Sequence, residues 1–208
     1  IAQRHQLIEL AKEEHGVAAA SAQSQARVAS DVAAAEKAWA ESKISRAQVE
    51  SAFGREAAAT LERMLPTITA MAEKYNLSEA AIIAMAKAES SFSQQAQSDK
   101  GAVGVMQMTA VAAEQVAART GISFAQMRDG WKENIEGGAA YMRWLLDNSK
   151  GAIKNIDDLA RAYNAGLGGM NKGFAETETH GNRVAAAYEK LTRAGMSSDE
   201  ILRANAAS

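Results

Sequence analysis

Glu89 is the residue whose position most directly indicates chemistry. It lies near the end of the stretch 78–91, in which Met85 and Ala86 belong to one apolar stripe if the stretch is helical. Glu89 falls on that stripe, four positions beyond Met85, where an apolar side chain is expected. Lys87 is two positions away and cannot face it on a helix. A carboxyl group held among apolar side chains without a cation favours its protonated form, which a general acid needs near neutral pH.

The position of Glu89 alone also fits a surface residue, because a Glu at the end of a fraying helix can reach solvent. Four short motifs in a fixed order favour a functional role instead. Along the chain they are Glu89-Ser90, Gly101-Ala102-Val103-Gly104-Val105-Met106-Gln107, Asn134-Ile135 with Gly138 and Tyr141, and Ala162-Tyr163-Asn164-Ala165-Gly166. Each motif is short, so the order and spacing of the four together carry the signal.

These motifs resemble those of the soluble lytic transglycosylase family, whose SLT domain is similar to goose-type lysozyme. The family shows E-S, G-A-x-G-L-M-Q, N-I-x-x-G-x-x-Y and A-Y-N-A-G in the same order. The resemblance covers about residues 62–193 and implies an all-α, lysozyme-like fold there. The family commonly has Leu where Val105 stands and a Pro soon after Gln107, two departures that should not disturb the chemistry.

The resemblance also implies roles for individual residues. Glu89 stands at the family's single catalytic Glu, and the implied substrate contacts are Ser98, Met106, Gln107, Tyr163, Asn164 and His180. Among them, Met106 stands at a pocket-lining position. Gln107 can donate to and accept from an N-acetyl group, and the Tyr163 hydroxyl can hydrogen-bond a carboxyl group in an apolar cleft.

Some of these assignments have competing structural interpretations. Met106 also fits ordinary core packing, and Ser98 also fits a simple turn residue. His180 stands where the family usually has the Tyr of an E-T-x-x-Y-V pattern, so it is the least direct transfer. Tyr141 and Trp144 lie in the middle of a predicted helix, and we expect them in the core rather than in the cleft.

The implied substrate is the β-1,4 bond between N-acetylmuramic acid and N-acetylglucosamine in peptidoglycan glycan strands. Protonated Glu89 gives its proton to the leaving glycosidic oxygen, while the substrate's N-acetyl group helps to stabilise the oxocarbenium-like state. Glu89 then takes the proton of the muramic C6 hydroxyl, which attacks C1 and closes a 1,6-anhydro ring. This reaction needs one carboxyl group rather than the usual glycosidase pair, and no metal or cofactor.

Two other functions stay open at this point. A goose-type lysozyme, which is a true hydrolase or muramidase, would need a second carboxylate to position water, and Asp99 is the nearest candidate in the sequence. A non-catalytic helical module of an envelope-spanning secretion or phage machine would keep the fold with an idle cleft. The presence of both Glu89 and Gln107 argues against idleness.

The elements that must position these residues are helices. Periodicity and capping residues predict helices over 78–91, 109–120, 131–146, 157–163 and 182–193, with a last short helix starting after Ser197. A loop over 93–104 separates the first two. We therefore expect an all-α catalytic domain over residues 61–208, with an Ala-rich helical extension over residues 1–60.

Composition agrees with this class and excludes others. The chain of 208 residues has one Pro and no Cys, which favours helix and rules out disulfides and thiolate metal sites. Its three His residues lack zinc-ligand spacing. A formal net charge of -2 offers no basic field for nucleic acid, and no apolar run is long enough to span a membrane.

The extension shows no chemical motif. Val28, Val32, Ala35 and Trp39 form one helical apolar stripe, and Gly16 and Ser42 to Ser45 can interrupt the helices. A stripe must be buried against the catalytic domain or a protein partner. The missing initiator Met indicates a processed chain or one cut from a larger protein. Activity on peptidoglycan implies the periplasm or cell envelope, reached by export or within a virion, although no signal peptide is visible.

Overall fold

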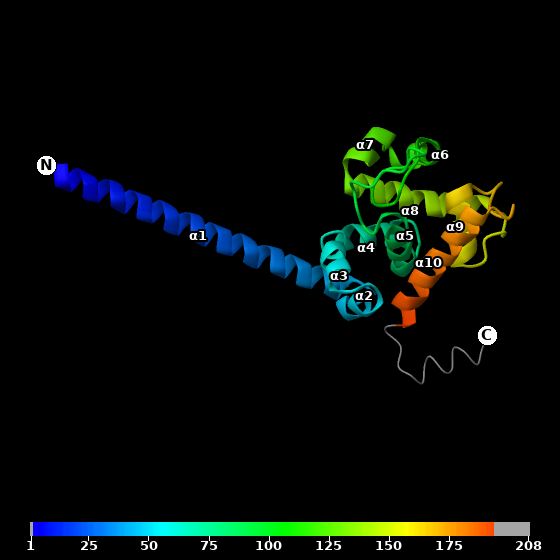
Figure 1. Cartoon of the computed structure of the whole chain (residues 1–208), viewed down its shortest axis with the longest axis horizontal. Coiled ribbons are helices and arrows are strands. Elements are labelled where there is room, and N and C mark those ends of the chain that lie inside the picture. Colours follow the sequence, from blue (N-terminus) through cyan, green and yellow to red (C-terminus); the bar gives the residue numbers. More distant parts are fainter. Residues whose placement is uncertain (1, 194–208) are drawn as a thin grey trace. The chain divides into compact units, whose positions relative to one another are not determined.

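The computed structural model describes residues 2–193, with side chains from residue 19 onward. The regular elements of this part of the chain are all helices joined by loops, and its only β pairing consists of isolated bridges between residues 97, 103 and 108 (Figure 1). The helices are α1 (Ala2–Glu41), α2 (Arg46–Phe53), α3 (Arg55–Glu62), α4 (Leu65–Lys74), α5 (Glu79–Ser90), α6 (Ala110–Thr120), α7 (Phe124–Asp129), α8 (Trp131–Asn148), α9 (Ile156–Ala165) and α10 (Ala175–Arg193). The predicted all-α class is confirmed, whereas the short helix predicted after Ser197 lies outside the described residues.

The chain divides into two units after Ala38. In the first unit, α1 continues through Gly16 without the predicted interruption, because a single Gly costs only about 1 kcal/mol in a helix rich in Ala. Val28 and Val32 of the predicted apolar stripe are more than half exposed. None of the helices in the described part of the chain combines the length and hydropathy that a bilayer crossing requires.

The second unit begins at Trp39 rather than near residue 60, where the sequence analysis drew the boundary. The indole N–H of Trp39 donates to Glu62 at 2.8 Å, and α2 packs against α10. The buried Glu79 carboxylate accepts hydrogen bonds from the Ser42 hydroxyl and the Lys43 N–H, at 2.5 Å and 3.0 Å. Residues 39–60 therefore belong to the compact unit that carries the motifs.

Helix α5 runs through the core of this unit and packs against α4 and α10 (Figure 1). All of its residues from Glu79 to Ala86 are buried, and the small Ala side chains let neighbouring helices approach on several sides. The helix ends sharply because Ser91 adopts the left-handed conformation (φ 53°) and the Phe92 N–H bonds back to Ala86. The fully buried Phe92 packs 6.5 Å from the Phe53 ring of α2.

Helix α8 supports the loop between α5 and α6. It packs against α4, α6, α7 and α9, so it connects most of the second unit. At Gly138 a Cβ atom would lie 2.6 Å from the Cβ of Met106, which explains why the motif needs glycine there. This close packing lets the loop that carries Met106 lie directly against α8.

We predict that a chain beginning at Trp39 keeps the thermal stability of the second unit, whereas one beginning at Ala57 melts at a lower temperature. The shorter chain lacks α2, whose Val49 is fully buried and whose Phe53 packs on Phe92. Burial of each such side chain stabilises the fold by about 1.5–3 kcal/mol. Calorimetric melts of both chains test this. Equal melting temperatures would show that residues 39–56 are not part of the compact unit.

Candidate active site

Glu89 lies in the last turn of α5, in the wall of a cavity of about 280 Å³. Only 13% of its side chain is exposed. The cavity lies between the loop before α6, the end of α9 and the first turns of α10. Its lining residues are Glu89, Ser98, Lys100, Ala102, Gln107, Thr109, Tyr163, Asn164, Glu176, His180 and Arg183. The structure thus brings together every predicted site residue except Met106.

The loop positions Ser98 in a tight turn. The Ser98 hydroxyl accepts the N–H of Ala102 at 3.0 Å, and the Ser98 carbonyl accepts the N–H of Gly101. Gly101 has φ 80°, a conformation that favours glycine. Because the hydroxyl oxygen accepts from the backbone, its own O–H is left to donate into the cavity. The turn and the sugar-contact interpretations of Ser98 are therefore compatible.

Gln107 also closes the loop on itself. Its amide nitrogen donates to the carbonyls of Ala96 and Gly104, both at 3.0 Å, and its backbone is left-handed with φ 45°. Both N–H groups are used, so only the amide oxygen remains for a ligand. The sequence analysis expected Gln107 to donate as well as accept, and the structure leaves it as an acceptor.

Asn134 at the start of α8 holds the loop from below. It is fully buried: its amide oxygen accepts the Met106 N–H at 2.7 Å, and its amide nitrogen donates to the carbonyls of Val103 and Met127. A Cβ atom at Gly104 would lie 2.4 Å from this amide. The sequence analysis quoted Asn134 as a motif residue without giving it a role. An Asn at a helix position that faces the core must find hydrogen-bond partners there, and this could have indicated that Asn134 holds the loop.

Met106 does not line the cavity. Its side chain is fully buried against Gly138, so the core-packing alternative describes it and the pocket-lining expectation is corrected. The Met106 backbone nevertheless matters, because its carbonyl accepts the Tyr163 hydroxyl at 2.8 Å. The sequence analysis expected the Tyr163 hydroxyl to hydrogen-bond the catalytic carboxyl group, but in the structure it donates its hydrogen bond to the loop instead. Its ring packs edge-on against Tyr141 at 5.2 Å.

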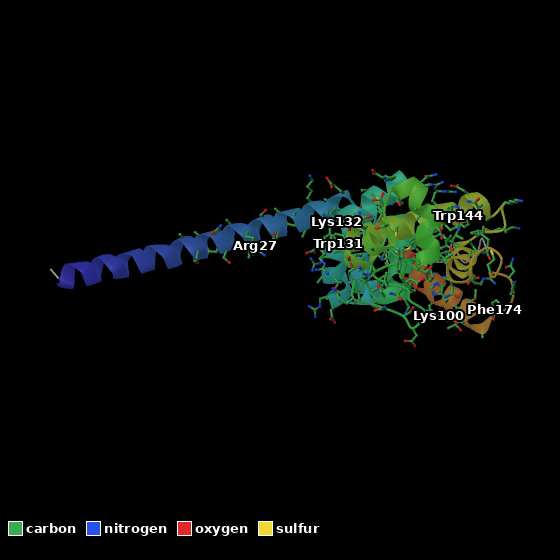
Figure 2. All side chains as sticks on the ribbon, turned by 90° about the horizontal axis from the view of Figure 1, so that it is seen from above. Arg27, Lys100, Trp131, Lys132, Trp144 and Phe174 are labelled. Carbon is green, nitrogen blue, oxygen red and sulfur yellow. The ribbon has the colours of Figure 1, made fainter. Side chains whose placement is uncertain are left out.

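Tyr141 and Trp144 on α8 continue the row of aromatic rings that begins with Tyr163 on α9. Tyr141 is buried, as expected of a core residue, and Trp144 stacks on it at 5.9 Å. Trp144 itself is partly exposed and lies at the surface of the second unit (Figure 2). Neither residue lines the cavity.

Helix α10 supplies the opposite wall. Asn164 at the end of α9 accepts a hydrogen bond from the buried Thr177 at 3.2 Å, which links α9 to α10. Lys100, at the surface in Figure 2, binds Glu176 at 2.7 Å across the cavity mouth. Asp99, the candidate second carboxylate, is exposed and does not line the cavity.

His180 lies next to Glu89. Its Nε2 atom is 3.3 Å from the Glu89 Oε1 atom, and only 1% of the residue is exposed. The Arg183 guanidinium lies 3.2 Å from the other ring nitrogen, Nδ1. Sequence analysis missed Arg183 because the helix was expected to begin at residue 182, after His180, so the two residues were not placed on one helical face. In the structure α10 begins at Ala175, so residues 180 and 183 are three apart on one helical face.

No group of three His, Asp or Glu side chains in the described residues could hold a metal ion. The cavity wall instead offers one buried carboxyl group, one imidazole, two cations and several hydroxyl and amide groups. Such a set can protonate a leaving group and hydrogen-bond a polar ligand.

A family model described as the transglycosylase SLT domain matches residues 66–186. The chain belongs to this family. Membrane-bound lytic murein transglycosylase C of Serratia proteamaculans is 30% identical over 151 residues, which cover 62% of this chain and 40% of that protein. The corresponding Yersinia enterocolitica protein is 31% identical over 54% of this chain and 34% of its own length. This chain thus spans less than half the length of either relative.

Solved structures of similar fold agree. The lytic transglycosylase Slt of Pseudomonas aeruginosa, solved as an inactive mutant, matches with a TM-score of 0.56 and 23% identity over 69% of this chain and 26% of that one. The 70 kDa soluble lytic transglycosylase of Escherichia coli matches with a TM-score of 0.54 and 20% identity over 66% of this chain and 26% of that one. At these identities the likeness shows the fold, and it confirms the predicted lysozyme-like class.

The SLT domain holds Glu89 in its protonated form at neutral pH. Burial raises the pKa of the Glu89 carboxyl to about 8, against the opposing charge of Arg183. Burial and Arg183 lower the pKa of the His180 imidazole to about 4. Both shifts are opposite to those of an ion pair. The close contact between Glu89 and His180 therefore joins a neutral acid to a neutral imidazole at pH 7.

We predict that Glu89→Gln stabilises the SLT domain increasingly as the pH rises from about 5 to about 8. The folded protein, with a pKa of about 8 at Glu89, binds more protons there than an unfolded chain with a pKa of about 4.3. The free energy of unfolding of the wild type therefore falls over this window, by up to about 1.4 kcal/mol per pH unit, and that of Glu89→Gln does not.

Denaturant unfolding of both proteins across this range measures the difference. Glu114→Gln, on the exposed face of α6, is the matched control and should show no such divergence. Wild-type and Glu89→Gln stabilities that run parallel with pH would mean that Glu89 is ionised in the folded protein.

Proposed function

We propose that this chain is a peptidoglycan lytic transglycosylase that cleaves the β-1,4 bond between N-acetylmuramic acid and N-acetylglucosamine. One observation carries the proposal: a single buried carboxyl group, Glu89, lies in the cavity wall with its pKa raised to about 8. A carboxyl group with such a pKa is an acid at neutral pH and becomes a strong enough base once it has given up its proton. The names of the relatives, lytic murein transglycosylases, support this choice of substrate.

The reaction uses Glu89 twice. Its proton goes to the glycosidic oxygen as the bond from that oxygen to muramic C1 breaks, and N-acetylglucosamine leaves with a free 4-hydroxyl. The muramic N-acetyl group stabilises the oxocarbenium-like centre at C1. The Glu89 carboxylate then takes the proton of the muramic C6 hydroxyl, whose oxygen bonds to C1. No water is consumed, and Glu89 is again protonated.

The loop and α9 supply the contacts to sugar in this proposal. The Ser98 O–H can donate to a hydroxyl or N-acetyl oxygen, and the Gln107 amide oxygen can accept an N–H or O–H, because their other groups are bound within the loop. Asn164 lines the same cavity from the end of α9. Tyr163 holds the loop against α9 through the Met106 carbonyl.

Hydrolysis is the second candidate, because Glu176 also lines the cavity. A lysozyme-type reaction would need this carboxylate to activate water. Glu176 is 66% exposed and paired with Lys100, whose hydrogen bond lowers the pKa of that carboxyl. A carboxylate so stabilised is a weak base, so we favour the transglycosylase reaction.

The proposed place of action is the cell envelope. Peptidoglycan is found there, and the relatives named above are described as membrane-bound. For the first unit we propose docking or assembly with a protein partner, because α1 carries no residue of the site and exposes Val28 and Val32.

We predict that Glu89→Gln lowers the rate of peptidoglycan cleavage by about a hundredfold or more, because the amide cannot cycle a proton. Turbidity clearance of purified sacculi measures the rate, and circular dichroism checks folding. Asp99→Asn, outside the cavity, serves as the control and should clear sacculi at the wild-type rate. A folded Glu89→Gln protein with near wild-type clearance would refute the assignment.

We also predict that the products carry 1,6-anhydromuramic acid, both from the wild type and from Glu176→Gln. The reason is that the proposed chemistry uses Glu89 alone and consumes no water. Mass spectrometry of the released muropeptides distinguishes the outcomes. Wild-type products that are heavier by one water would establish hydrolysis, and their loss in Glu176→Gln would identify Glu176 as the second carboxylate.

A further inference from the structure

His180 and Arg183 form a hydrogen-bonded pair that points at Glu89 from α10. The Arg183 Nη2 atom lies 3.2 Å from His180 Nδ1, and His180 Nε2 lies 3.3 Å from Glu89 Oε1. All three residues line the same cavity. His180 is 1% exposed, and its Nε2 atom is buried without a hydrogen-bond partner among the described residues, so its contact with Glu89 is a close approach that is not aligned as a hydrogen bond. Within the described part of the chain, the Glu89 Oε1 atom is the carboxyl oxygen that lies within 4 Å of this nitrogen.

The guanidinium decides which ring nitrogen of His180 carries the proton. Arg side chains have N–H donors and no acceptor, so Nδ1 must accept the hydrogen bond from Arg183. A neutral imidazole with an accepting Nδ1 carries its hydrogen on Nε2. The low pKa of His180, about 4, keeps the ring neutral at pH 7. The Nε2–H group that results lies beside Glu89 Oε1, with the two heavy atoms 3.3 Å apart and not yet aligned as a hydrogen bond.

We infer that His180, locked in its Nε2–H form by Arg183, is a positioning residue for Glu89; this inference rests on the proposed function. A small rotation of either side chain turns this 3.3 Å contact into a hydrogen bond from Nε2–H to Oε1, in which Oε1 acts as the carbonyl oxygen of the neutral acid and the acidic proton resides on Oε2. After that proton has moved to the glycosidic oxygen, the same N–H donates to the carboxylate. The pair thus orients the acid in the first half of the reaction and stabilises the base in the second.

The other titratable groups around the pair leave this arrangement intact. Tyr163, on α9, donates a hydrogen bond from its hydroxyl to the Met106 carbonyl, so it does not compete for Glu89. Glu176, one turn before His180 on α10, is held by Lys100 from the loop. Arg183 acts on both partners, because its charge lowers the pKa of Glu89 and that of His180.

The first test reads the tautomer of His180 in the unmodified full chain. Proteins labelled with nitrogen-15 in histidine give ring signals that separate the Nε2–H, Nδ1–H and doubly protonated forms, and comparison with His180→Gln assigns the His180 signals. We expect the neutral Nε2–H form at pH 7. A doubly protonated ring or the Nδ1–H form would overturn the inference without reference to activity.

The second test compares a variant that lacks the donor with one that restores it. His180→Leu should lower kcat by about 10- to 100-fold, the size of a lost hydrogen bond to a charged group, with little change in KM. Loss of the donor favours protonated Glu89, so the alkaline limb of the pH–rate profile should move to higher pH. His180→Gln, which carries an amide N–H, should recover part of kcat and shift the limb back.

Glu89→Gln in the same assay separates this inference from the proposed function. An active Glu89→Gln protein would mean that the proposed function has failed. If Glu89→Gln is inactive while His180→Leu keeps the wild-type kcat and alkaline limb, the function stands and the positioning role is wrong. Equal losses in folded His180→Leu and His180→Gln, with an unmoved limb, would also contradict it, because a merely structural histidine gives that result.

Discussion

The removal of one carboxyl group from water is the constraint on which the site depends. Glu89 could reach solvent from most helix ends, and its pKa would then be ordinary. Here the left-handed residue Ser91 ends α5 directly after the carboxyl group, and Phe92 closes the helix end with its buried ring. Glu89 is left in the cavity wall, 13% exposed, with a pKa of about 8. Burial of the neutral acid costs far less free energy than burial of its ionised form.

Most polar groups around the cavity hydrogen-bond to other groups of the protein, and only a few are left to bind a ligand in the cavity. Asn134 makes hydrogen bonds to three backbone groups below the loop. Gln107 donates both of its amide hydrogens to carbonyl groups within the loop, and the Tyr163 hydroxyl donates to the Met106 carbonyl. A loop tied down in this way loses little conformational entropy when it binds a ligand. Its remaining acceptor and donor, on Gln107 and Ser98, stay oriented before any sugar arrives. Preorganised groups of this kind are effective in catalysis.

Sequence reasoning found the fold class and most of the cavity wall, because ordered motifs report loop and helix geometry together. It failed where tertiary contacts override local patterns. The helix was predicted to begin at residue 182, but Gly181 packs closely against Asp157 and Arg161 inside α10, which puts His180 and Arg183 on one face. Met106 was expected to line the pocket, but in the structure its side chain fills the space beside Gly138. The second unit begins at Trp39 and not near residue 60, because Trp39 is hydrogen-bonded to Glu62, and the periodicity of the sequence does not reveal a contact of this kind.

The protonation state of Glu89 tests the account most directly. Carbon-13 NMR of the side-chain carboxyl groups in the full chain, with the Glu89 signal assigned by its absence in Glu89→Gln, follows this titration without any substrate. The account predicts a midpoint near pH 8, since burial raises the pKa of this carboxyl to about 8. A midpoint close to the ordinary glutamate value of about 4.3 would contradict it, because Glu89 would then have no proton to give at neutral pH.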